Sequence, residues 1–304
     1  MAASGILNVN KDGGRTSYAV VGLVKRHAGG AKVGHAGTLD PAATGVLLVC
    51  VGQAVRVSEY IMALPKVYRA RVRLGFATDT YDAEGQATAP PRPVDVSRER
   101  LREVLGRFEG DIQQAPPAYS ALKVGGRAAY RLARQGEAVV LSPRPVRVYR
   151  LDLLSFEPPF FEIEVECGKG TYIRSLAHDI GRELGCGGHL AELVRTRVGP
   201  FSIESAVGVA DLEAALTDGS WRELLQPPDV ALTDLPALTI SIEDEKDLRH
   251  GQAVRLDEAA KPPGPAPSDG VECRGYAEDG SLIGILRFDA GGGVWRPRKV
   301  FTAA

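Results

Sequence analysis

The chain is poor in the residues that build disulfide frameworks and metal centres. Its 304 residues include five histidines and four cysteines, none of them in a CxxC spacing: Cys50, Cys167, Cys186 and Cys273. We therefore expect reduced thiols in a cytoplasmic protein that uses no metal or other cofactor. No apolar run is long enough to cross a bilayer, and the N-terminal residues lack the pattern of a signal peptide, so we expect no membrane association.

A general excess of basic charge is also missing. The formal net charge is −1, which argues against a uniformly basic nucleic-acid-binding protein. Within residues 121–150, however, seven Lys or Arg residues accompany one acid, Glu137. This segment predicts a local phosphate-binding surface, and the alternative interpretation is an ordinary solvated face. The length accommodates one large domain, or a domain with a smaller module.

One stretch combines turn residues, a histidine and an acid with an apolar run: residues 34–48, GHAGTLDPAATGVLL. The continuous apolar run at residues 46–51 predicts a central strand that is buried on both faces. The glycines and the Asp40-Pro41 step predict a tight turn before it. Asp40 is therefore expected on a loop at the mouth of a buried strand. The alternative interpretation is that Asp40 only shapes the turn.

The same stretch resembles the catalytic loop of the TruB family of pseudouridine synthases. Residues 34–45 match every fixed position of the family pattern G-H-x-G-T/A-L-D-P-x-A-T-G. The resemblance implies an α+β pseudouridine synthase fold, with a mixed, mainly antiparallel central sheet flanked by helices. It also implies an isomerase that converts the uridine at position 55 in the T-loop of tRNA. Asp40 would be the nucleophile, and His35 would fill the gap left by the flipped base.

Residues 67–75 alternate between apolar and arginine side chains, which predicts a half-buried strand with a basic outer face. Tyr68 falls on the apolar side, where the simplest interpretation is a core aromatic. The sequence from Lys66 to this tyrosine resembles the family motif K-x-Y. The resemblance implies that Tyr68 stacks on the flipped uracil and that its hydroxyl helps to remove the C5 proton. Residues 75–85 resemble the family loop that follows.

Residues 161–167 alternate and predict another strand, and apolar residues between 173 and 184 recur at helical spacing. Tyr172 and Arg174 stand at the beginning of that helix and resemble the family motif G-T-Y-I-R. Arg174 is the candidate partner of Asp40, because a guanidinium holds a carboxylate through two hydrogen bonds. The resemblance implies that Tyr172 lines the pocket. Residues 189–201 resemble a further motif, in which Leu193 matches the apolar pocket residue.

Local patterns predict three more elements in the first half of the chain. Residues 6–9 read as a first strand, and a helix over residues 17–25 follows Thr16 or Ser17 as its cap. A second helix follows Ser97.

Basic residues are the candidate contacts to RNA. Lys11 matches a lysine in the first family motif and is expected to contact the substrate. Residues 113–134 resemble the family segment that clamps the RNA stem-loop, which assigns backbone contacts to Lys123, Arg127 and Arg131. Phosphate contacts of this kind position the RNA without reading its sequence.

Beyond a proline-containing region near residues 226–236, strand patterns at 238–242, 271–277, 282–287 and 295–300 predict a smaller β module. The segment His250-Gly251-Gln252 resembles the start of a PUA domain, a small β-barrel that binds RNA. We divide the chain into a catalytic domain, residues 1–232, and a PUA-like RNA-binding domain, residues 233–304. The catalytic domain contains the RNA-clamping insertion at about residues 113–145.

The resemblance implies that the T-arm stem-loop of tRNA is the partner, and we expect a monomer with no obligatory protein partner. A hydrolase of glycosidic bonds stays open as an alternative, although it needs a second acid as proton donor and none accompanies Asp40 in its loop. A non-catalytic RNA-binding protein would not need Asp40, Tyr68 and Arg174 together. Guide-RNA-dependent pseudouridine synthases are the nearest alternative enzymes, and the basic clamp favours the stand-alone bacterial type.

Overall fold

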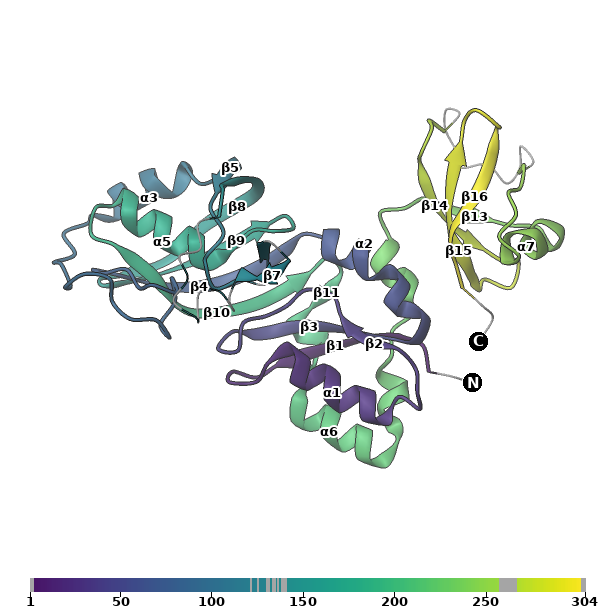
Figure 1. The fold of residues 1–304 in the computed structure, drawn as a ribbon, viewed down its shortest axis with the longest axis horizontal. Helices are drawn as coiled ribbons and strands as arrows, with labels where there is room; N and C mark the ends of the chain where they lie inside the picture. Colours follow the sequence, from purple (N-terminus) through teal and green to yellow (C-terminus); the bar gives the residue numbers. More distant parts are fainter. Residues whose placement is uncertain are drawn as a thin grey trace.

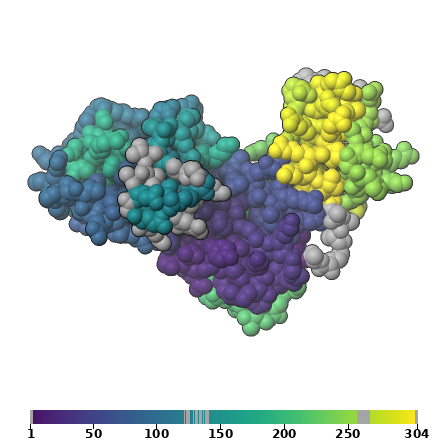
Figure 2. All heavy atoms as spheres, in the orientation of Figure 1, coloured from purple at the N-terminus to yellow at the C-terminus, as the bar shows by residue number. Residues whose placement is uncertain are grey.

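The computed structural model describes residues 3–301, apart from residues 121, 125, 130, 131, 133, 134, 136, 138–140 and 257–266. Its main feature is a ten-stranded sheet in which eight strands follow the order β12-β1-β3-β10-β4-β9-β8-β5, with β2 beside β3 and β11 beside β10. A four-stranded sheet, β13-β14-β15-β16, forms a separate lobe near the C-terminus (Figures 1 and 2). A short hairpin, β6-β7, completes the strands.

The strands of the large sheet are β1 (Gly5–Lys11), β2 (Val33–His35), β3 (Thr44–Val51), β4 (Lys66–Leu74), β5 (Gly110–Gln114), β8 (Arg144–Glu157), β9 (Phe160–Cys167), β10 (Gly188–Val198), β11 (Phe201–Ser202) and β12 (Val207–Gly208). The remaining strands are β6 (Lys123–Val124), β7 (Arg127–Ala128), β13 (Ala237–Thr239), β14 (Glu272–Tyr276), β15 (Leu282–Asp289) and β16 (Val294–Val300). The α-helices are α1 (Ser17–His27), α2 (Ser58–Ala63), α3 (Arg98–Gly106), α5 (Ile173–Glu183), α6 (Val209–Asp218) and α7 (Ile242–Arg249).

The large sheet is mixed but mainly antiparallel, as expected. Among the described strands of this sheet, only the pairs β1–β12 and β3–β10 run parallel. Strand β3 is buried on both faces: Val46 and Leu48 join the core beside α2, whereas Leu47 and Val49 join the core beneath α1 and α6. The prediction of a central strand here is confirmed, because its unbroken apolar run has a hydrophobic layer on each side.

In the part of the chain that the structure describes, helices cover the other half of the sheet on one face. Helices α3 and α5 pack on β4, β8 and β9 through one hydrophobic cluster, which includes Ala70 and Val72. The opposite face is charged: Arg69 and Arg73 are exposed, and Arg71 pairs with Glu192 at 3.0 Å. The predicted alternation of β4 is therefore confirmed.

Strand β10 joins the two halves of the sheet, since it pairs with β3 on one side and β4 on the other. Gly45 allows this junction: its φ is +98°, and a Cβ there would lie 2.2 Å from the carbonyl oxygen of Arg195. No L side chain fits such an approach, so glycine is required at this point. Sequence patterns did not predict β10, although it carries the junction on which the site depends.

Two helix caps lie where the sequence predicts them, and one predicted strand ends earlier than expected. The side chains of Thr16 and Ser97 accept hydrogen bonds at the starts of α1 and α3, as predicted. The predicted strand at residues 238–242 is wrong at its end, because β13 stops at Thr239. Ser241 then caps α7, which begins at Ile242.

The C-terminal lobe docks against α2 (Figure 1). Ile285 and Phe301 share a hydrophobic cluster with Ile61. Polar contacts surround this cluster, including the ion pair between Lys299 and Glu59 at 2.7 Å. The predicted boundary at residues 232 and 233 stays a prediction. In the described ranges, no helix is long and apolar enough to cross a membrane.

Candidate functional site

The Asp40 loop lies between β2 and β3 and is fastened to α1. Ser17, the first residue of α1, donates its hydroxyl to the carbonyl of Leu39 at 3.0 Å and accepts from the N–H of Leu39 at the same distance. The carbonyl of Asp40 accepts from the N–H of Ala43 at 3.1 Å, which closes the turn. The loop is therefore held in a defined shape directly before the buried strand β3.

Lys11 holds the Asp40 loop through hydrogen bonds from its buried ammonium. Its side chain is 0% exposed, and its ammonium donates to the carbonyls of Asp12, Arg15 and Pro41 at 2.8, 2.8 and 3.1 Å. Burial lowers the pKa of Lys11. This placement does not provide the expected substrate contact, because a fully buried ammonium with three carbonyl acceptors cannot reach an RNA phosphate. The structure gives Lys11 a loop-holding role instead.

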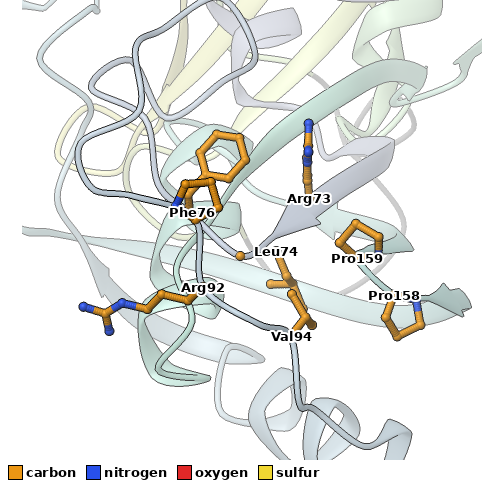
Figure 3. A pocket seen from close by; sticks show the side chains of 9 residues that line it. Arg73, Leu74, Phe76, Arg92, Val94, Pro158 and Pro159 are labelled. Atoms are coloured by element: carbon orange, nitrogen blue, oxygen red, sulfur yellow. The ribbon is translucent and has the colours of Figure 1, made fainter.

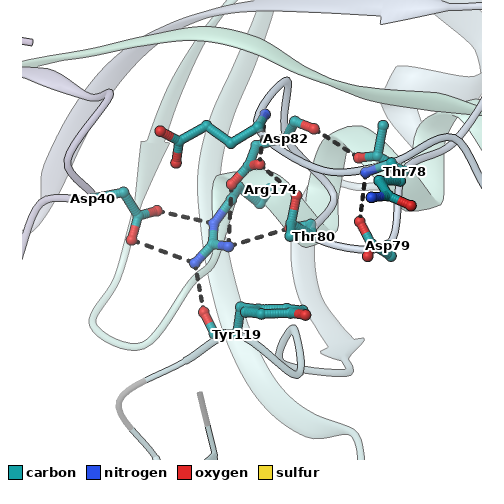
Figure 4. A network of polar contacts seen from close by, with 9 residues as sticks. Asp40, Thr78, Asp79, Thr80, Asp82, Tyr119 and Arg174 are labelled. Atoms are coloured by element: carbon teal, nitrogen blue, oxygen red, sulfur yellow. Dashed lines mark hydrogen bonds and ion pairs between the residues drawn. The ribbon is translucent and has the colours of Figure 1, made fainter. Parts of the chain in front are cut away.

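Arg174 and Asp40 meet as the sequence predicted, although they are 134 residues apart. The Nε of Arg174 lies 2.9 Å from Oδ2 of Asp40, and its Nη2 lies 3.4 Å from Oδ1 (Figure 4). Arg174 is buried in the first turn of α5, whereas the Asp40 side chain is 42% exposed. The carboxylate is thus oriented by two bonds and still open toward a substrate.

Arg174 makes three further contacts that fix its orientation. It donates from Nη2 to the carbonyl of Tyr119 at 2.9 Å, and from Nη1 to the carbonyl of Thr80 at 3.2 Å and Oδ2 of Asp82 at 3.3 Å (Figure 4). A single guanidinium therefore lies between two carboxylates. Asp82 was not among the predicted site residues. Asp82 matches the fixed acid of the family loop that residues 75–85 resemble, which was the available signal, but its pairing with Arg174 depends on long-range packing.

The charges around Asp40 oppose one another. On balance the pKa of this carboxyl is raised above its ordinary value, mainly by burial and further by the nearby negative charge of Asp82. The charge and hydrogen bond of Arg174 lower the pKa of Asp40, and Lys11 adds a smaller effect in the same direction. Arg174 is the main influence that keeps Asp40 ionised, and an ionised carboxylate is the form that acts as a nucleophile.

Tyr68 lies on β4 at the seam between the two halves of the sheet. Its half-buried ring packs against the clusters on both sides of the seam, as does Leu193 of β10. Burial raises the pKa of Tyr68, the charge of Asp40 raises it further, and the positive charge of Arg195 opposes the rise. Tyr68 and Asp40 therefore share one electrostatic environment, which the sequence could suggest only through the motif resemblance.

Arg195 is a buried residue that was not among the predicted site residues. It is 2% exposed, stands directly opposite Tyr68 in the β4–β10 pairing, and donates to the carbonyls of Val46 and Gly37 at 2.7 and 3.0 Å. Gly37 belongs to the Asp40 loop, so Arg195 ties that loop to β10. Apolar periodicity did not distinguish this arginine from its exposed neighbour Arg197, and the available signal was its match to a fixed arginine of the motif at residues 189–201.

His35 and Tyr172 occupy the edges of this region. The Nδ1 atom of His35 is buried, and the structure describes no hydrogen-bond partner for it. Burial and the charge of Arg195 lower the pKa of His35, so the ring is neutral near neutral pH. Tyr172 exchanges two backbone hydrogen bonds with the side-chain amide of Gln114, at 2.8 and 3.0 Å.

The predicted RNA clamp is only partly described. Arg127 is exposed in β7 and pairs with Glu137 at 3.1 Å. Arg131 and the side chain of Lys123 lie outside the part of the chain that the structure describes. Their expected phosphate contacts stay predictions.

Two other features of the described chain bear on where the reaction centre lies. Within the described ranges, no three His, Cys, Asp or Glu residues come together as a set of metal ligands. A shallow pocket of about 380 Å³ lies at the far end of β4, lined by Arg73, Phe76, Arg92, Val94 and Pro159 among others (Figure 3). The residues that line it include no acid and none of the predicted site residues. The Asp40 region is therefore the better candidate for the reaction centre.

Comparison with known proteins identifies a family. Residues 25–173 match the model of the N-terminal domain of the TruB family pseudouridylate synthases, and residues 174–233 match the model of the tRNA pseudouridylate synthase B C-terminal domain. The tRNA pseudouridine synthase B of Dehalococcoides mccartyi (strain ATCC BAA-2266 / KCTC 15142 / 195) is 41% identical over 99% of this chain and 97% of its own length. The protein of that name from Pseudomonas aeruginosa (strain UCBPP-PA14) is 45% identical over 85% of this chain and 86% of its own.

Solved structures give the same fold. A chain from a Cbf5-Nop10-Gar1 complex aligns with a TM-score of 0.72 and 30% identity, over 93% of this chain and 78% of its own. A chain from the archaeal box H/ACA sRNP Nop10-Cbf5 complex aligns with a TM-score of 0.74 and 28% identity, over 99% of this chain and 87% of its own. The α+β fold expected from the sequence is thereby confirmed.

The two carboxylates around Arg174 yield a prediction for pH titration. Replacing Asp82 by asparagine removes a negative charge, so the pKa of Asp40 should fall. A carbon-detected NMR titration of the aspartate carboxyl groups measures this, with Asp40→Asn identifying the signal. Asp79→Asn is the matched control, because Asp79 is exposed in the same loop and does not contact Arg174. An unchanged or raised pKa in Asp82→Asn would contradict the proposed coupling.

Proposed function

Because the chain belongs to the TruB family of pseudouridylate synthases, we propose that it isomerises the uridine at position 55 in the T-loop of tRNA to pseudouridine. The observation that carries this proposal is the Arg174–Asp40 pair, in which a buried guanidinium aims a partly exposed carboxylate. The names of the relatives support tRNA as the substrate.

The reaction begins with base flipping. A uridine inside the folded T-loop is inaccessible, so it leaves its stack at a cost of a few kcal/mol. His35 lies at the end of β2 beside the Asp40 loop and is proposed to fill the vacated space. Its neutral ring suits contact with bases better than a charged one would.

Asp40 then supplies the nucleophile, either at C1′ of the sugar or at C6 of the base. The N1–C1′ bond breaks, the uracil turns, and C5 forms the new bond to C1′. The bond from Asp40 also breaks: C5 displaces the carboxylate if it had attacked C1′, or the carboxylate leaves C6 if it had attacked there. C5 loses its proton and N1 gains one, so the product is an isomer of the substrate. Arg174 holds Asp40 in the ionised form that this attack requires.

Tyr68 is proposed to stack on the flipped uracil and to take part in removal of the C5 proton. Its ring is the aromatic surface at the seam beside the Asp40 loop, and stacking on an RNA base is favourable for any aromatic side chain. The form of Tyr68 that accepts a proton is the phenolate. Burial disfavours this form, since it raises the pKa of the phenol. The charge of Arg195, on the opposite strand, works in favour of acceptance.

The basic segment at residues 121–150 and the C-terminal lobe are proposed to bind the RNA stem. Residues 1–232 would form the catalytic domain, and residues 233–304 a PUA-like module. Arg298 and Lys299 of β16 already pair with Glu59, so other basic residues of this lobe would contact RNA. We further propose a cytoplasmic, monomeric enzyme that needs no protein partner and no cofactor.

Two other functions fit the site less well. A glycosidic-bond hydrolase needs a carboxylic acid that donates a proton, and Asp82 is the available second acid. Both of its oxygens already accept hydrogen bonds, from Arg174 and from the hydroxyl of Thr80, which disfavours the proton-donor role. A purely RNA-binding protein would gain nothing from holding Asp40 by a bidentate arginine.

The proposed function is tested by Asp40→Asn, which keeps the side-chain shape and removes the nucleophile. Purified wild-type and variant proteins are incubated with an unmodified tRNA transcript, and pseudouridine is mapped along the RNA. We expect wild type to modify the T-loop uridine at position 55, and the variant to bind tRNA equally but to leave every uridine unchanged. Turnover by the variant would contradict the nucleophile, and a wild-type product elsewhere would contradict the target.

The role of the Tyr68 hydroxyl is tested by Tyr68→Phe, which keeps nearly all of the stacking area. If the hydroxyl takes part in proton transfer, the single-turnover rate should fall by about 10²- to 10⁴-fold with little change in tRNA affinity. We expect this outcome. A rate within about threefold of wild type would show that only the ring matters, because single-turnover assays exclude product release.

A further inference from the structure

Tyr81 adopts a backbone conformation that side chains rarely occupy. Its φ is +65°, and it is the one non-glycine residue with a positive φ among the residues that the structure describes. An aromatic residue in this region costs about 1–3 kcal/mol, and such strain persists only where the surroundings enforce it. Tyr81 lies in the loop that contacts Arg174, so the strained conformation points to a structural role beside that arginine.

The ring of Tyr81 is held by the same helix that carries Arg174. It stacks on His178 with the ring centroids 3.9 Å apart and an interplanar angle of 19°. His178 follows Arg174 by four residues, so both side chains leave the same face of α5. The carbonyl of Tyr81 accepts from the N–H of Leu190 at 3.0 Å, which adds an anchor on β10.

The strained conformation directs the two neighbours of Tyr81 to one atom. The carbonyl of Thr80 and the carboxylate of Asp82 both accept from Nη1 of Arg174, at 3.2 and 3.3 Å (Figure 4). One acceptor is a backbone carbonyl and the other is a side-chain carboxylate, and both lie on a turn whose middle residue is Tyr81. The left-handed conformation of Tyr81 supplies that turn.

We propose that Tyr81 and His178 form a positioning clip, which presses Thr80 and Asp82 onto Arg174 and thereby fixes the guanidinium that aims Asp40. The inference deepens the proposed function and rests on it. Tyr81 and His178 are positioning residues, because they act on Asp40 through Arg174 and its acceptors. The clip explains why a bulky residue occupies a site where glycine would relieve the strain.

Two substitutions separate the ring from the backbone. Tyr81→Phe keeps the stack on His178, and Tyr81→Gly removes the ring while tolerating the positive φ, which protects the fold. We expect Tyr81→Phe to stay within about twofold of the wild-type single-turnover rate, and Tyr81→Gly to fall by about tenfold with tRNA affinity within about threefold. Tyr18→Ala, at a 78% exposed tyrosine of α1, is the control and should match wild type.

A double-mutant cycle shows whether the ring acts through Asp82. Once Asp82→Asn has weakened the contact to Arg174, adding Tyr81→Gly should lower the rate by less than about twofold more. A ring that merely stabilises the fold would multiply its full effect in either background. Equal losses in both backgrounds, or a Tyr81→Gly rate within about twofold of wild type, would overturn the clip.

Hydrogen exchange tests the clip without any RNA. Loss of the stack should free the loop, so the amide of Leu190 should exchange at least about tenfold faster in Tyr81→Gly than in Tyr81→Phe. If wild type forms no pseudouridine, the proposed function fails, and this comparison still decides the clip. Equal exchange in the two variants would overturn it.

Discussion

The geometry of the site depends on the buried guanidinium of Arg174. Arg174 is 6% exposed, and a guanidinium in such a place is stable only when its hydrogen-bonding capacity is satisfied. Its acceptors come from three segments that are far apart in sequence: the Asp40 loop, the loop around residues 80–82, and Tyr119. The hydrogen bonds to Arg174 therefore hold these three segments at the start of α5. The position of Asp40, the nucleophile, follows from this arrangement.

A second constraint sits at the seam of the sheet. Strand β10 bridges β3 and β4, and the close approach at Gly45 sets the register in which Arg195 faces Tyr68. Arg195 also holds Gly37 of the Asp40 loop. The acid and the aromatic ring are thus attached to one rigid junction, and rigidity of this kind is what a reaction with a flipped base requires.

Local chemistry was readable from the sequence. The apolar run of β3, the alternation of β4 and the caps Thr16 and Ser97 predicted their elements, because each depends on neighbours along the chain. The pairing of Asp40 with Arg174 came from complementary charge and motif resemblance. The burial of Lys11 and the roles of Asp82 and Arg195 were out of reach, because they depend on strand order and on loops that meet only after folding.

The central claim is that the bidentate Arg174–Asp40 contact prepares the nucleophile, and Arg174→Lys tests it most directly. Lysine keeps the positive charge but loses the planar fork that reaches both Asp40 oxygens and the carbonyls behind them. We predict that the single-turnover rate of pseudouridine formation falls by about 10²-fold or more, with tRNA affinity within about threefold of wild type. A rate within about threefold of wild type would show that charge alone suffices, and would contradict the account.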